Sequence, residues 1–404
     1  MIYDFTTMID RRGRDAMAVD MLPDMFHEKH DVKVRDGLDM IPMWVADMNF
    51  ATVPTVPAAL TERAAHPIYG YFSVRDEYYD EIIRWQKLHN QTNGLKREHI
   101  GYENSVLGGV ATALRVMADK GDPVLLHAPT YIGFTTLLKK AGYRIVLSPL
   151  VRDEDDIWRM DLEDMERRIV EENIKVTIFC SPHNPTGRVW EKWEAEQAMA
   201  LFEKYGVKVI ADEIWSDILL FGHRHVPVQS VSAYAAENTV ALYAPSKTFN
   251  LAGLIGSYHI IYNEKLKAAM DAEADATHYN GVNLMSMYAL IGAYKPEGYA
   301  WVRELNEVLG DNVNYACDYI RRRFDGVRVS RPEGTYMLFI DCEAWCRSHG
   351  KTMTELLNAG FEAGVFWQSG RLFNGPWFIR LNLALPKSRL EEAFARLDRY
   401  VFNA

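Results

Sequence analysis

The chain has 404 residues, 48% of them hydrophobic, and a formal net charge of -10 at pH 7 with a pI near 5.7. This acidic balance argues against nucleic acids and anionic membranes as partners. Four cysteines are too few for a disulfide framework, no apolar run reaches the roughly 18 residues that span a bilayer, and no apolar signal segment is visible, so we expect a soluble cytoplasmic protein.

Residues 1–45 form an irregular stretch with one short predicted helix, which we expect to be an arm that packs with a C-terminal domain. Residues 46–290 alternate short β-rich runs with helical stretches. This alternation predicts a large α/β domain with a mostly parallel sheet covered by helices. The strands are expected near 123–128, 144–148, 175–180, 207–211, 239–243 and 257–262.

The pattern changes after about residue 295, and residues 291–404 are expected to form a smaller α+β domain. A long helix is predicted over 298–323. Strands follow near 327–329, 336–340 and 377–381, with helices near 352–363 and 388–402. Both of these helices begin with a sequence typical of a capping box, namely Thr352 with Glu355 and Ser388 with Glu391.

Lys247 is the most informative single residue, because it follows the apolar run 239–243 and lysines rarely lie where a buried strand ends. A desolvated lysine has a lowered pKa and can form a Schiff base with an aldehyde. Asp212 follows a second apolar run, 207–211. Such a lysine, with an aspartate to pair with a pyridinium nitrogen, indicates a site for pyridoxal 5'-phosphate (PLP). Taken singly, the two residues have simpler explanations, as a surface lysine and a helix cap.

Three further signals accompany predicted strands and helix starts. Asn184 follows the strand near 175–180, Tyr131 follows the strand near 123–128, and Gly108-Gly109 opens a helical pattern. Ligands bind outside the carboxyl ends of the strands in open α/β sheets, so these residues and Lys247 are expected to form one site.

Longer motifs carry a family resemblance that spans nearly the whole chain. They are 43–50 (MWVADMNF), 69–71 (YGY), 181–187 (SPHNPTG), 212–214 (DEI), 246–253 (SKTFNLAG) and 378–384 (FIRLNLA). By these motifs the chain resembles fold-type I PLP enzymes of the aminotransferase class I/II superfamily, and most closely their cystathionine β-lyase and carbon–sulfur lyase branch. The resemblance implies a mostly parallel seven-stranded sheet in the large domain.

The resemblance also implies roles for individual residues. Lys247 matches the Schiff-base lysine, Asp212 the partner of the pyridine nitrogen, Asn184 the donor to the ring 3-oxygen, and Tyr131 the aromatic residue on the ring face. Arg380 matches the arginine that holds the substrate α-carboxylate, a task that suits a planar guanidinium. The simpler alternatives are an ordinary core tyrosine and a structural salt bridge.

The phosphate of PLP is expected at a helix N-terminus, where backbone N–H groups are free and the dipole is positive. Gly109, Val110 and Ala111 match the turn that supplies these N–H groups, and Ser246 matches a hydroxyl donor. Tyr71 matches a residue that reaches the phosphate from a second subunit. The resemblance therefore implies a homodimer with a shared active site.

Two positions depart from the family. The lyase branch usually has His where this chain has Trp215, and many aminotransferases have Tyr there. The stretch 253–256 (GLIG) lacks the phosphate-binding arginine of many aminotransferases, and its Leu254 matches the lyase branch, which favours a lyase. Trp44, Val45, Tyr71 and Trp367 could form the wall around the substrate side chain. Core or dimer packing is the simpler explanation, equally good for Trp44 and better for Trp367.

The leading functional hypothesis is a PLP-dependent β-lyase that cleaves L-cystathionine or S-substituted L-cysteines to a thiol, pyruvate and ammonia. An aminotransferase is the main alternative, because the same residues serve both reactions. A third hypothesis, a module that binds a transcription regulator, has no surface signal in its favour. No metal is expected: Cys342, Cys346 and His349 are a weak ligand set, and His27 and His30 are predicted surface residues.

Overall fold

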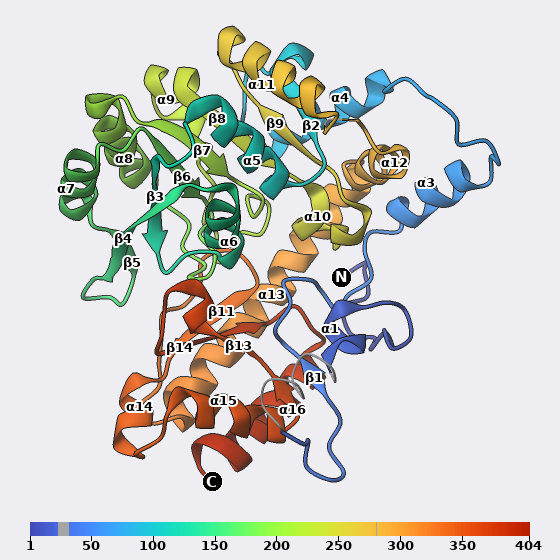
Figure 1. Ribbon diagram of the computed structural model, residues 1–404. Helices are drawn as coiled ribbons and strands as arrows, with labels where there is room; N and C mark the ends of the chain where they lie inside the picture. The colour runs from blue at the N-terminus through green and yellow to red at the C-terminus, as the bar shows by residue number, and fades with distance from the viewer. Residues whose placement is uncertain (23–31, 280) are drawn as a thin grey trace.

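The computed structural model describes residues 1–22, 32–279 and 281–404, so the predictions for His27 and His30 lie outside the described residues. A large α/β domain lies above a smaller α+β domain in Figure 1, with the N-terminal arm beside the smaller domain. The large sheet has eight strands, in the order β2-β9-β8-β7-β6-β3-β4-β5. These strands are β2 Ile100–Glu103, β3 Pro123–Ala128, β4 Arg144–Arg152, β5 Trp158–Met160, β6 Val176–Cys180, β7 Lys208–Asp212, β8 Thr239–Tyr243 and β9 Ser257–Ile260.

The centre of this sheet is parallel, as expected, from β4 through β3, β6 and β7 to β8. Antiparallel strands complete both edges, with β9 and β2 on one side and β5 on the other. The expected number of seven is wrong by one strand, because β4 continues into a short hairpin that adds β5. Strands β6 and β8 are buried along their whole length, as is typical of parallel strands covered on both faces.

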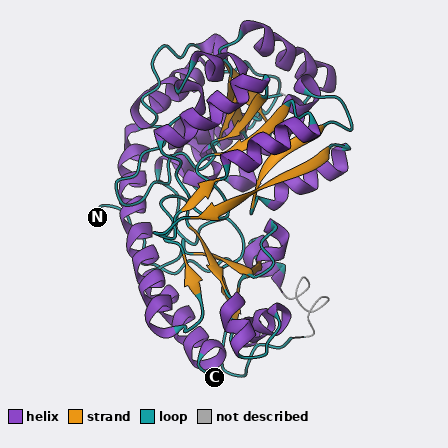
Figure 2. Cartoon of the chain, turned by 90° about the vertical axis from the view of Figure 1, so that its left-hand side faces the viewer, coloured by secondary structure: helices purple, strands orange, loops and turns teal. Residues whose placement is uncertain are grey.

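Helices lie on both faces of the large sheet (Figure 2). The helices of this domain are α3 Thr55–Ala64, α4 Asp76–His89, α5 Val106–Met117, α6 Ile132–Ala141, α7 Leu162–Glu172, α8 Lys192–Tyr205, α9 Ala233–Asn238, α10 Pro245–Thr248, α11 Glu264–Thr277 and α12 Leu284–Ala293. The long α13, Pro296–Arg323, runs from the large domain into the smaller one (Figures 1 and 2).

The smaller domain has a four-stranded antiparallel sheet in the order β10-β11-β14-β13. Its strands are β10 Arg328–Val329, β11 Met337–Asp341, β13 Gln368–Ser369 and β14 Phe378–Asn382, and its helices are α14 Glu343–Ser348, α15 Met353–Glu362 and α16 Lys387–Leu397.

The two predicted capping boxes have different outcomes. Thr352 and Glu355 form the expected reciprocal cap of α15. The capping box predicted at Ser388 is wrong, because α16 begins one residue earlier behind Pro386, and no side chain caps it. Proline fixes a backbone angle that suits a helix start, so Ser388 lies inside the first turn instead of before it.

The N-terminal arm contains α1, Met17–Asp20, and the short strand β1, Ile41–Pro42. β1 pairs in parallel with β12, Val365–Phe366, which joins the arm to the smaller domain. The boundaries near 45 and 290 remain predictions. No described helix is long and apolar enough to cross a membrane.

Candidate active site

A cavity of about 190 Å³ lies outside the carboxyl ends of the parallel strands. Its walls come from the loops after β2, β3, β6, β7 and β8, as expected for the crevice of an open α/β sheet. Six of the residues singled out in the sequence line it, namely Tyr131, Asn184, Asp212, Trp215, Ser246 and Lys247.

Lys247 lies in α10, directly after the buried strand β8. Its Nζ donates a hydrogen bond to the backbone oxygen of Ala46 at 2.7 Å and lies 5.7 Å from the centre of the Trp215 ring. Burial, and after it the charge of Arg380, lowers the pKa of Lys247 to about 8. An appreciable fraction of this amine is therefore neutral, and able to accept a proton, near neutral pH.

Asp212 is the last residue of β7 and is only 4% exposed. One carboxylate oxygen accepts the N–H of Ile214 at 3.1 Å. Burial raises the pKa of Asp212 to about 7, against the opposing effects of this hydrogen bond and of Lys247. A buried carboxylate that faces a cavity in this way suits a cationic group, such as a protonated ring nitrogen.

Arg380 comes from β14 of the smaller domain and is 4% exposed. Its Nη1 donates to Asn184 Oδ1 at 3.1 Å, and its Nη2 donates to the Trp44 carbonyl at 3.1 Å and to Gln368 Oε1 at 2.5 Å. Its Nε has no partner, and in the part of the chain that the structure describes no carboxylate pairs with it. The alternative of a structural salt bridge therefore finds no support in the described residues.

An unpaired buried guanidinium is costly unless a ligand completes it. Burial lowers the pKa of Arg380 to about 10, although the neighbouring Tyr131 and Tyr336 oppose this shift. The guanidinium lies 4.3 Å from the centre of the Phe373 ring, which leaves its polar edge for hydrogen bonding. Arg380 does not itself line the 190 Å³ cavity but contacts Asn184, which does, and an α-carboxylate is the kind of anionic group with two oxygens that a guanidinium binds.

The three residues predicted for the phosphate turn do not form the start of a helix. Helix α5 begins at Val106 behind the cap Ser105, whose hydroxyl accepts the N–H of Gly108. Gly109, Val110 and Ala111 therefore lie inside the helix, and the Gly109 N–H donates to the Ser105 carbonyl. This correction follows from the serine cap, which fixes where the helix starts.

The cavity wall at this helix end comprises Asn104, Ser105, Val106 and Leu107. The N–H groups of the first helical residues have no partner within the helix, so this end can hold a phosphate. The sequence signal that would have located it is a serine before an apolar run, which is typical of an N-cap.

The predicted wall residues have different positions. The Trp44 indole donates to the Ala18 carbonyl in the arm, so its side chain packs against α1, and only its carbonyl faces Arg380. The Val45 carbonyl accepts from Asn382. Trp367 is fully buried and donates to Leu357, which makes it a core residue. Tyr71 is fully exposed on the loop between α3 and α4 and does not line the cavity within this chain.

Several supporting residues carry no clear sequence signal. Tyr336 donates to the same Ala46 carbonyl as Lys247, at 3.0 Å. The buried Glu213 accepts the N–H of Val228 at 2.9 Å and also pairs with His225 and with the Tyr243 hydroxyl. This network fixes the chain beside Asp212. Such contacts join residues far apart in the sequence, so spacing cannot reveal them.

Two members of the weak metal ligand set, the cysteines, lie in the core of the smaller domain, whereas His349 is exposed. Cys342 and Cys346 are fully buried, and the Cys346 thiol contacts Met353. Within residues 1–22, 32–279 and 281–404, no group of three or more His, Cys, Asp or Glu side chains could hold a metal ion.

The fold and the cavity together define the fold-type I class of PLP enzymes. The family model for aminotransferase class I and II matches residues 39–397, so the chain belongs to this PLP-dependent family. It is 31% identical over 362 residues to the cystathionine β-lyase PatB of Bacillus subtilis (strain 168), a match that covers 89% of this chain and 92% of that protein.

Two solved structures resemble the whole chain. The PLP-bound C–S lyase from Staphylococcus hominis is 29% identical with a TM-score of 0.88, covering 99% of this chain and 98% of the other. A PLP-bound putative aminotransferase from Clostridium difficile 630 is 32% identical with a TM-score of 0.91, covering 98% and 99%.

Proposed function

We propose that this chain is a PLP-dependent carbon–sulfur β-lyase. It cleaves L-cystathionine or related S-substituted L-cysteines by α,β-elimination to a thiol, pyruvate and ammonia. With L-cystathionine the thiol is homocysteine. The observation that carries the proposal is a buried guanidinium without a described carboxylate partner, Arg380, together with a lysine of lowered pKa in the same site. The similarity to proteins named as cystathionine β-lyase and C–S lyase supports this reaction.

Arg380 binds the substrate by its α-carboxylate. Asn184, Gln368 and the Trp44 carbonyl hold its guanidinium group in place. Little side-chain freedom is therefore lost when the substrate binds. This clamp fixes the amino acid at the carboxylate end and directs Cα and the side chain into the cavity.

The residues around the cavity fit PLP. Asp212 would face the ring nitrogen, Asn184 the ring 3-oxygen, Tyr131 the ring face, and the first turn of α5 with Ser246 the phosphate. When bound, PLP supplies an electron-accepting ring that makes the Cα proton of an amino acid removable.

Lys247 accepts the Cα proton of the substrate at its Nζ. Its lowered pKa, about 8, provides the neutral amine that this step needs near neutral pH. The Ala46 carbonyl holds Nζ at 2.7 Å and thereby orients the amine. Elimination then follows if Cβ carries a thiolate that can leave.

The alternative function is that of an aminotransferase, and the similarity to a protein described as a putative aminotransferase supports it. In that reaction Lys247 would hold and deliver the same proton, and no thiol would leave the substrate. Leu254, where many aminotransferases place an arginine, favours the lyase. Added 2-oxo acid distinguishes the two: turnover of L-cystathionine without it supports the lyase, whereas turnover that depends on it establishes the aminotransferase.

We further propose a homodimer with shared active sites. The loop between α3 and α4 exposes four large apolar side chains, a concentration typical of a protein interface. These are Ile68, Tyr69, Tyr71 and Phe72. Tyr71 would reach the phosphate site of the second subunit.

A further inference from the structure

A single arginine of the N-terminal arm makes a two-point contact beside the candidate active site. Arg11 Nη2 lies 2.5 Å from Asp47 Oδ2, and Arg11 Nη1 lies 3.1 Å from Asp47 Oδ1. The two side chains are only 19% and 18% exposed. Nη1 also donates to Asn49 Oδ1 at 3.3 Å. A paired, largely buried contact of this kind fixes geometry better than a surface ion pair.

The segment 44–49, to which Asp47 belongs, contacts both chemically important cations. Its Trp44 carbonyl accepts from Arg380, and its Ala46 carbonyl accepts from Lys247. Further bonds to the segment come from Tyr336, Asn382 and Asn250, which hold the backbone oxygens and one N–H of 45–48. A displacement of this segment would therefore move the acceptor of the reactive amine.

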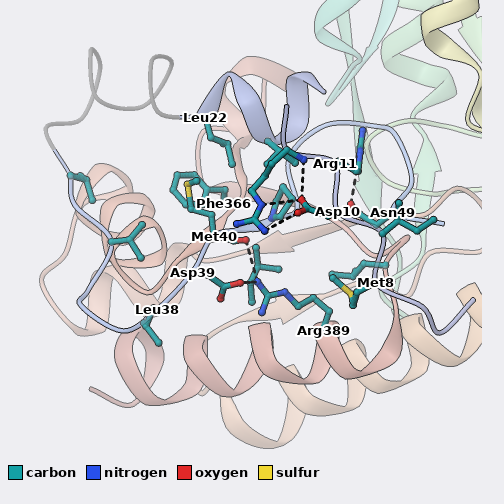
Figure 3. A pocket seen from close by; sticks show the side chains of 18 of the residues that line it. Met8, Asp10, Arg11, Leu22, Leu38, Asp39, Met40, Asn49, Phe366 and Arg389 are labelled. Carbon is teal, nitrogen blue, oxygen red and sulfur yellow. Dashed lines mark hydrogen bonds and ion pairs between the residues drawn. The ribbon is translucent and has the colours of Figure 1, made fainter. Parts of the chain in front are cut away.

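Among the described residues, a cavity of about 800 Å³ lies beside this part of the arm. Residues 8–22, residues 32–42 and Arg389 of α16 contribute to its wall (Figure 3). Arg11 and Asn49 belong to its wall. Because the cavity leaves room around this part of the arm, polar contacts such as the Arg11–Asp47 pair have to fix the position of Arg11.

The charges around Lys247 give the pair an electrostatic effect as well. Asp212 from β7, Asp47 from the segment 44–49 and Arg380 from β14 all act on the amine, with Tyr131, Tyr336 and Cys180 also near the cavity. Burial and Arg380 lower the pKa of Lys247, while Asp47 and Asp212 raise it. Arg11 offsets the charge of Asp47.

We propose that Arg11 is a positioning residue for Lys247. By pairing with Asp47, Arg11 fixes the position of the Ala46 carbonyl, which accepts the hydrogen bond from Lys247 Nζ. The pair also offsets the negative charge of Asp47, which acts on the Lys247 amine. The inference rests on the proposed function in one respect, since it takes Lys247 to be the reactive lysine.

The test measures the reactivity of the Lys247 amine in the full-length protein without cofactor or substrate. Trace acetic anhydride labels lysines across a pH series, and peptide mass spectrometry reports the labelling of Lys247. The midpoint is the pH at which labelling of Lys247 is half-maximal. In Arg11→Ala this midpoint should rise by about one pH unit, because Arg11 no longer offsets the negative charge of Asp47. In Asp47→Asn it should fall. Arg11→Lys should restore most of the wild-type midpoint.

Arg12→Ala is the matched control, because Arg12, the next arm residue, forms an exposed ion pair with Asp10 and no other ion pair with the described residues. It should leave the midpoint unchanged. Both Arg11→Ala and Asp47→Asn break the same ion pair, so a purely structural role would move both midpoints in one direction. Shifts of the same sign, or no shift in either variant, would overturn the proposal. Should Arg11→Ala not fold, a lower midpoint in Asp47→Asn with a nearly unchanged midpoint in Arg11→Lys supports the proposal, and any other combination overturns it.

Because the assay needs neither PLP nor turnover, it separates this proposal from the proposed function. A holoenzyme without lyase activity could still show the opposite shifts, and an active lyase could lack them.

Discussion

At the scale of single residues, the site holds two basic side chains and one acidic side chain whose pKa values differ from those of the same groups in water. Lys247 and Arg380 have lowered pKa values, and Asp212 has a raised pKa, in each case mainly because of burial. Lys247 and Asp212 line the same cavity, and perturbed groups that share a cavity are typical of functional sites. Three residue changes test their separate roles.

Replacing Lys247 by alanine removes the proton acceptor. We expect kcat to fall by about 10²–10⁴-fold, with the protein still folded, since the side chain contributes chemistry and little packing. Pyruvate release measures the loss. Lys208→Ala, an exposed lysine of β7, is the control and should keep its activity.

Replacing Arg380 by lysine keeps the positive charge but removes the planar guanidinium group. We expect kcat/KM to fall about 10–100-fold, mainly through KM, because an ammonium cannot bind a carboxylate at two points. The control is Arg328→Lys, an exposed arginine of β10. An unchanged KM would show that the α-carboxylate binds elsewhere.

We expect the buried carboxyl group of Asp212 to destabilise the folded, cofactor-free protein at neutral and higher pH. Its carboxyl binds a proton more tightly in the folded chain, where the pKa is about 7, than in the unfolded chain, where it is near 4. Its contribution therefore becomes less favourable as pH rises from about 4 to 7, and levels off above. Asp212→Asn should stabilise the cofactor-free protein by roughly 2–4 kcal/mol at pH 8, with little difference at pH 4.

Thermal unfolding at a series of pH values measures this difference. Asp155→Asn, at an exposed acid for which no comparable change is expected, serves as the control. A stability gain that does not depend on pH would contradict the interpretation. The same variant should bind PLP more weakly, because the ring nitrogen loses its anionic partner.

At the scale of elements, apolar runs located most of the large sheet. The runs at 123–128 and 239–243 match β3 and β8 at both ends, because fully buried parallel strands need continuous apolar sequence. The edge strands β2 and β5 are not predicted, because their sequences, IGYE and WRM, are not continuous apolar runs. The sequence places the start of α5 at Gly108-Gly109, whereas the Ser105 cap sets this start at Val106.

The start of α5 gives a prediction at this scale. Val106→Pro removes one N–H from the first helical position while the preceding Ser105 is already extended, so the helix itself should tolerate the change. We expect PLP to bind about tenfold more weakly, in line with the loss of one charge-assisted hydrogen bond. Val106→Ala keeps the N–H and removes similar packing, so it should bind PLP nearly normally. Cofactor titration followed by absorbance compares the two.

At the scale of the whole molecule, the site draws on both domains and, by our proposal, on a second subunit. Arg380 and Gln368 come from the smaller domain, whereas Lys247 and Asp212 come from the large one. Sequence motifs identified these residues singly, but only the fold shows that they meet. Trp44 illustrates the limit: its motif was recognised, yet its indole packs on the arm because α1 offers a carbonyl partner.

The dimer predicts complementation between two impaired variants. Lys247→Ala and Tyr71→Ala should each have low activity, and refolding an equal mixture should restore about one quarter of the native sites. Half of the dimers would be hybrids, each with one intact site. No recovery, in a mixture shown to contain hybrids, would mean that Tyr71 serves its own chain or none.

The most direct test of the central claim is the stoichiometry of products from L-cystathionine, with purified PLP-loaded protein and no 2-oxo acid. A lyase releases pyruvate, ammonia and free thiol in equal amounts over many turnovers. The account predicts this result. No pyruvate, with the cofactor converted to its amino form once an amino acid is added, would contradict it and identify an aminotransferase.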